Sequence, residues 1–158
     1  MSAYKDLVIE AFDRAETYVG CSEEQALTYA CEEIIERELG VRIMVSKELN
    51  MWIDKICQCE DIDTPNLIVA RTAKSHVASA HIEENHICIR GKNTTAATVL
   101  HEIAHISVGI DGHGVLFRDE LVRLCRAHIS VEFASMLHGL YAATGLEMSP
   151  WPASATQR

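Results

Sequence analysis

The chain has 158 residues, of which 48% are hydrophobic and 23% are charged, and its formal net charge is −9 at pH 7. This composition is typical of a globular domain with a core of its own, and no apolar run approaches the roughly 18–20 residues of a membrane span. The excess of acidic over basic side chains, 23 against 14, argues against a broad electrostatic surface for nucleic acid. We therefore expect neither tight nucleic-acid binding nor membrane association.

The N-terminus and the cysteines indicate a reducing compartment. Residues 1–6 lack the basic-then-apolar layout of a signal peptide. Six cysteines are scattered along the chain, mostly at apolar positions of periodic segments, which favours packed thiols over disulfides. Cys57 and Cys59 are separated by one residue and no second pair follows, so a zinc ribbon is not expected. We expect a cytoplasmic protein.

Hydrophobic periodicity predicts mainly helices in the N-terminal part of the chain. An apolar stripe at helical spacing runs from Tyr4 to Val19. Ser22 followed by Gln25 forms a capping box, which marks the start of a second helix, and Gly40 is a natural end for it. The predicted elements are helices over residues 4–19, 22–40 and 49–56 and a short strand over 41–45.

Short strands come next, and helices complete the chain. Residues 83–85 have the composition of a hairpin turn. Thr94 or Thr95 can cap a helix that runs to about Val108, and Ser130 can cap the last helix. The predicted elements are strands over 67–70, 76–82 and 86–90 and helices over 95–108 and 130–145, with a further helix between these two that includes residues 117–125. Together they predict an α+β fold, with several helices packed on a short, mainly antiparallel sheet. We expect one domain over residues 1–147 and a disordered tail over 148–158.

Residues 101–105, His-Glu-Ile-Ala-His, have the pattern H-E-x-x-H. On a helix, positions i and i+4 share one face, so His101 and His105 can bind one metal ion. Glu102 lies close enough to reach a water molecule on that ion without being a ligand. Two histidines with a neighbouring carboxylate are typical of zinc hydrolases, in which the carboxylate is the general base. The pattern therefore predicts a zinc site.

A zinc ion in such a site needs a third protein ligand. His113 is the nearest candidate, and the glycines on either side of it let the backbone turn back toward the metal. Asp111 is the alternative, because five residues separate it from His105, the spacing at which metzincins place their third ligand. A downstream glutamate, Glu120 or Glu132, is a further alternative, although both have the simpler interpretation of solvated helix positions.

The run over residues 98–105, followed by His113, Gly114 and Phe117, resembles the SprT-like zinc metalloproteases, in which the third histidine stands in a His-Gly-x-x-Phe element. The chain is most similar to the small actinobacterial and phage H-E-x-x-H metallohydrolases related to that group. The resemblance covers residues 86–147 well and the N-terminal half weakly. It implies a zincin-like domain around the H-E-x-x-H helix, with His101, His105 and His113 as zinc ligands and Glu102 as the base.

Two departures from that family limit what the resemblance implies. The gap between His105 and His113 is shorter than in the larger SprT-like enzymes. The zinc ribbon and the DNA-binding segments of some relatives are absent, so a DNA-linked role is not implied. If the gene belongs to a phage, the expected location is the host cytoplasm.

The sequence therefore predicts a zinc metallopeptidase that acts on a protein or peptide substrate. His138 and Tyr141, three residues apart on the last helix, are candidates for donors to an oxyanion, although an ordinary surface or core position is the simpler interpretation of each. Three alternatives remain open. They are a regulatory, anti-repressor-like protease with one partner substrate, a catalytically silent metal-bound binding protein, and a hydrolase of non-peptide amides.

Overall fold

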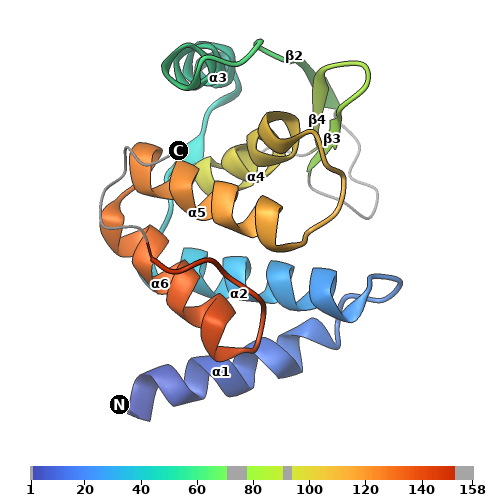
Figure 1. Cartoon of the computed structure of the whole chain (residues 1–158). Helices are drawn as coiled ribbons and strands as arrows, with labels where there is room; N and C mark the ends of the chain where they lie inside the picture. Colours follow the sequence, from blue (N-terminus) through green and yellow to red (C-terminus); the bar gives the residue numbers. More distant parts are fainter. Residues whose placement is uncertain (1, 71–77, 91–93, 152–158) are drawn as a thin grey trace. The chain divides into compact units, whose positions relative to one another are not determined.

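The computed structural model describes residues 2–70, 78–90 and 94–151. Over these ranges the chain folds into six α-helices and two small β-sheets (Figure 1), which confirms the predicted α+β class. The chain divides into two compact units. The first unit is Met1–Gly40 with Gly112–Arg158, and the second is Val41–Asp111. The single domain expected over residues 1–147 stays a prediction.

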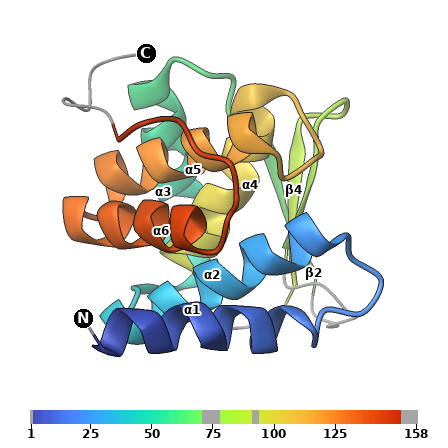
Figure 2. The same cartoon turned by 60° about the horizontal axis from the view of Figure 1, so that its bottom comes forward.

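The first unit is helical. Its helices are α1 (Ser2–Ala15), α2 (Glu23–Leu39), α5 (Val115–His128) and α6 (Val131–Ala143). Helix α2 packs against α1 and α6, and α6 packs against α5, as Figure 2 shows. Two predicted caps are confirmed: the Ser22 side chain accepts a hydrogen bond from the Gln25 N–H, and that of Ser130 accepts one from the Phe133 N–H. These caps fix where α2 and α6 begin.

Buried apolar side chains from α2, α5 and α6 form the core of this unit. The largest of them are Ile34, Ile35, Phe117, Phe133 and Tyr141. The Tyr141 hydroxyl donates a hydrogen bond to Glu32 Oε1 at 3.1 Å, which supplies the partner that a buried phenol needs.

The first helix is shorter than its apolar stripe predicts. Helix α1 ends at Ala15, and the chain then turns through hydrogen bonds such as that from the Tyr18 N–H to the Ala15 carbonyl. Val19 is 94% exposed, so its assignment to the buried stripe is wrong. The turn before Gly20, which has a φ of 88°, removes Val19 from the helical face.

The second unit contains the sheets. Its elements are β1 (Ile43–Met44), α3 (Ser46–Glu60), β2 (Asn66–Ala70), β3 (Ala78–His81), β4 (His86–Arg90), β5 (Thr94–Thr95) and α4 (Ala96–Val108). Strand β1 pairs with β5 in antiparallel fashion. The other sheet has the order β2-β4-β3, in which β3 and β4 form the predicted hairpin while β2 and β4 are parallel. The sheet is therefore mixed, with one parallel pair beside the antiparallel one.

Helix α4 packs against strand β3 within this unit. Ile87 and Ile89 of β4 are buried, as are Val99 and Ile103 of α4, so the hairpin and the helix both contribute to the core. The predicted helix over 49–56 is longer in the structure, from Ser46 to Glu60. Part of the predicted strand over 76–82 and the end of the predicted tail, residues 152–158, lie outside the described residues.

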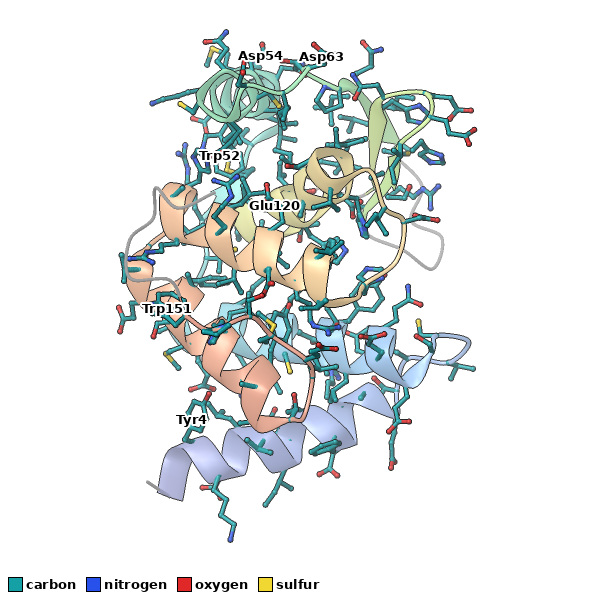
Figure 3. All side chains as sticks on the ribbon, in the orientation of Figure 1. Tyr4, Trp52, Asp54, Asp63, Glu120 and Trp151 are labelled. Atoms are coloured by element: carbon teal, nitrogen blue, oxygen red, sulfur yellow. The ribbon has the colours of Figure 1, made fainter. Side chains whose placement is uncertain are left out.

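The start of the segment that we expected to be a disordered tail contacts the first unit. The Ser149 N–H donates to Asp119 Oδ1 at 3.0 Å. The ring of Trp151, labelled in Figure 3, lies 5.3 Å from that of His138 and carries the Arg126 guanidinium over it at 5.0 Å. Among the helices of the described ranges, none has both the length and the apolar character needed to cross a bilayer.

All six cysteines are free in the structure, and most are buried. Burial raises the pKa of Cys31 to about 12 and that of Cys57 to about 11, and it raises the pKa of Cys125 well above its usual value. The thiolate, rather than the thiol, is the nucleophile. These buried thiols are therefore protected from alkylation both because reagents cannot reach them and because they stay protonated. Cys59 is exposed.

We therefore expect Cys59 to react first with iodoacetamide at pH 8 in the native protein, and Cys31 and Cys125 to react only as the chain unfolds. A thiol with a pKa near 12 has a thiolate fraction of about 10⁻⁴ at pH 8. Mass spectrometry of peptides after timed alkylation gives the order of reaction. Denatured, unreduced protein should show six reactive thiols, and a lower count would mean that a bridge exists in solution.

Candidate metal centre

The H-E-x-x-H residues lie in helix α4. The helix begins because the Thr95 hydroxyl accepts a hydrogen bond from the Thr98 N–H at 3.0 Å, and it ends at Gly109, whose φ of 65° is left-handed. His101 and His105 project from the same face, with ring centroids 5.0 Å apart, and both are buried. The spacing of i and i+4 thus places two imidazoles side by side in the second unit.

The ring of His105 is held by the main chain just after the helix. Its Nδ1 lies 2.8 Å from the carbonyl oxygen of Ile110. A carbonyl oxygen can only accept, so Nδ1 carries the proton of the neutral ring and Nε2 keeps its lone pair. A histidine that binds a metal commonly donates its other N–H in this way, which fixes the tautomer and the orientation of the ring.

Glu102 follows His101 on α4 and is 5% exposed. Burying a carboxylate is costly unless its charge is balanced by hydrogen bonds or a cation. A buried carboxylate beside two buried imidazoles is therefore typical of a site that holds a positive charge.

His113 belongs to the first unit, two residues before the start of α5. Its ring makes edge contacts with Tyr29 of α2, at a centroid distance of 4.9 Å, and with Phe117 of α5, at 4.8 Å. Its carbonyl oxygen accepts a hydrogen bond from Arg118 Nη1. His113 is thus fixed within its own unit by two aromatic rings and one guanidinium.

Arg118 is a residue of this region that sequence reasoning missed. Its side chain is 1% exposed, donates to Glu24 Oε1 at 2.7 Å, and donates to the Glu147 carbonyl at 2.9 Å. It joins α2, α5 and the segment that follows α6 to the loop that carries His113. The sequence does contain a sign of this role: Arg118 falls within the apolar stripe of the predicted helix. A charged residue at such a buried position needs partners for its charge.

The alternative third ligands have different surroundings. Asp111 is exposed and is the last residue of the second unit. Glu120 on α5, labelled in Figure 3, accepts hydrogen bonds from Arg123 at 2.8 and 2.9 Å. Glu132 is exposed in the first turn of α6. Glu132 thus fits the simpler interpretation of a solvated helix position, whereas the Glu120 side chain is only 15% exposed and is held by its ion pair with Arg123.

The two candidate oxyanion donors are engaged within the first unit. The ring of His138 is hydrogen-bonded through Nε2 to the Ser149 carbonyl at 2.8 Å. Tyr141 is fully buried and donates to Glu32, and burial raises its pKa well above the usual value. Tyr141 therefore fits the simpler interpretation as a core residue.

Two groups of potential metal ligands occur among the described residues. They are His101, His105 and His113, and His81, Glu84 and His86. Comparison of the chain with protein-family models, with curated proteins and with solved structures gives no match. The chemistry of these two groups has to be inferred from the residues themselves.

Proposed function

We propose that the chain is a zinc-dependent metallopeptidase, in which His101, His105 and His113 bind Zn²⁺ and Glu102 is the general base. The observation that carries this proposal is the hydrogen bond between His105 Nδ1 and the Ile110 carbonyl. This hydrogen bond leaves the lone pair of Nε2 free to bind a metal ion. The ring that carries Nε2 lies on the same helix face as the ring of His101.

The residues fit zinc in number and in kind. Three imidazoles form a common catalytic donor set for Zn²⁺, which leaves a fourth position for water. His113 is three residues beyond Ile110, and three extended residues span at most roughly 11 Å. Chain connectivity therefore keeps His113 near the residue that orients His105, which supports His113 over a ligand from elsewhere in the chain.

When bound, zinc supplies Lewis acidity and lowers the pKa of its water toward about 7. On the protein side, the Glu102 carboxylate would take up the proton released as water adds to the scissile carbonyl carbon, and it would then deliver that proton to the nitrogen of the leaving amine. Burial of Glu102 excludes bulk water from this transfer.

The proposed substrate is a protein or peptide in extended conformation. Strand β3 is at the edge of the β2-β4-β3 sheet as far as the described residues go, and it packs against α4, the helix of the motif. An edge strand can pair with an extended peptide through main-chain hydrogen bonds. This arrangement favours a peptide over a small amide, and the acidic balance of the chain still leads us to expect no tight nucleic-acid binding.

Metal removal tests the proposal. We expect about one zinc per chain at the motif, and we expect hydrolysis of an unfolded protein substrate to stop after dialysis against a chelator and to return with added Zn²⁺. Elemental analysis and a gel assay of substrate cleavage measure the two quantities. Hydrolysis that survives complete removal of metal would contradict a zinc peptidase.

A further inference from the structure

The β3–β4 hairpin carries a second cluster of metal-ligating side chains. His81 ends β3 and His86 begins β4, and the two residues are directly paired across the strands. Their rings are stacked, with centroids 4.2 Å apart and an interplanar angle of 21°. Glu84 lies in the turn between them. The hairpin register thus brings together three potential ligands that all belong to residues 81–86.

The carboxylate of Glu84 lies at nearly equal distances from both rings. Its Oε2 is 3.8 Å from His81 Nδ1 and 3.7 Å from His86 Nδ1. Two ligands of a tetrahedral zinc ion, each bonded at about 2.0–2.1 Å, lie about 3.3 Å apart. The Glu84–histidine distances therefore exceed those of an occupied site by only a few tenths of an ångström, and the potential ligand atoms of all three side chains lie within 4.8 Å of one another.

The far side of the His81 ring has a partner as well. Its Nε2 lies 3.4 Å from the Ser79 hydroxyl, two residues earlier on the same strand. A hydrogen bond at the outer nitrogen is the usual support of a metal-binding histidine, and it leaves Nδ1 to face Glu84. Glu84 is exposed, at 69%, and His86 is half-buried, so an ion can reach the cluster from solvent.

We propose that His81, Glu84 and His86 form a second metal site, separate from the histidines of α4, which takes a borderline divalent cation such as Zn²⁺ or Cu²⁺. Two imidazoles and one carboxylate are suited to these cations, whereas Ca²⁺ and Mg²⁺ require oxygen ligands. The ion joins the end of β3 to the start of β4, and β3 packs against the helix that carries His101 and His105. The site therefore stabilises the hairpin that supports this helix.

Titration of the metal-free full-length chain with Zn²⁺ tests the site, and the substitution Glu84→Gln is the main variant. We expect Glu84→Gln to lower the affinity for one of the zinc equivalents by at least about 10-fold. Even the loss of a hydrogen-bond partner of a metal ligand lowers metal affinity about 10–100-fold. Glu83→Gln, at the exposed neighbouring turn residue, removes the same charge and should leave both equivalents unchanged. His81→Asn with His86→Asn should remove one equivalent altogether.

The number of equivalents separates this site from the proposed active site. The double variant His81→Asn with His86→Asn should bind one zinc fewer than the wild type, whether the wild type binds two or only one, and Glu84→Gln should bind that same equivalent more weakly. In the wild type, Cu²⁺ added up to two equivalents should broaden the ring NMR signals of His81 and His86, and it should bind the hairpin more tightly than Zn²⁺. The proposal is overturned if Glu84→Gln and Glu83→Gln bind zinc alike, or if these ring signals stay unchanged at saturating metal.

Discussion

Replacing Glu102 with glutamine is expected to lower the rate of peptide hydrolysis by about 10²–10⁴-fold, the usual contribution of a general acid–base group. The amide of glutamine has nearly the same shape as the carboxylate, but it cannot accept the proton of the attacking water or return it to the leaving amine. We expect the loss in kcat with little change in KM, because Glu102 acts in the transition state rather than in substrate binding.

The same variant must keep its fold and its zinc for this result to identify a base. Zinc content by elemental analysis and the midpoint of thermal unfolding should both stay close to the wild-type values. Glu132→Gln is the matched control, because it makes the same change at an exposed position of α6 and should leave hydrolysis intact. If Glu102→Gln retains nearly full turnover with zinc bound, the general-base role is wrong and so is the proposed mechanism.

Local signals in the sequence were reliable where the structure depends on local contacts. The Ser22, Thr95 and Ser130 caps and the left-handed Gly109 all lie where the sequence predicts the ends of helices. Each of these features depends on hydrogen bonds between residues only a few positions apart. The same locality explains why the H-E-x-x-H residues could be assigned to one helix face from their spacing.

Features that depend on distant parts of the chain could not be predicted. The parallel pairing of β2 with β4 joins segments about 20 residues apart, and the alternation of side chains along a strand does not specify its neighbour. Arg118 is buried because Glu24, which precedes it by 94 residues, accepts its hydrogen bond. The stacking of His81 on His86 depends on the hairpin register, which the composition of the turn does not specify by itself.

The identity of the third ligand can be decided by comparing two substitutions. We expect His113→Ala to weaken zinc binding at the motif by at least about 10–100-fold, because the loss of a direct ligand costs no less than the loss of an outer partner. Asp111→Ala should leave most of the zinc bound. Competition with a chromophoric chelator measures both affinities, and His138→Ala, which removes a histidine outside both ligand groups, is the control.

The expected loss at His113 has a structural component that must be separated from ligation. The ring contacts Tyr29 and Phe117, and an aromatic contact of this kind contributes about 0.5–1.5 kcal/mol. His113→Asn retains a polar side chain but removes the imidazole, so it should lose zinc as His113→Ala does. Thermal unfolding of both variants without metal then measures the stability that is lost with the ring contacts to Tyr29 and Phe117, separately from any loss of zinc binding. If Asp111→Ala loses zinc while both His113 variants keep it, the third ligand is Asp111, and the site has the spacing of metzincins rather than that of SprT-like proteases.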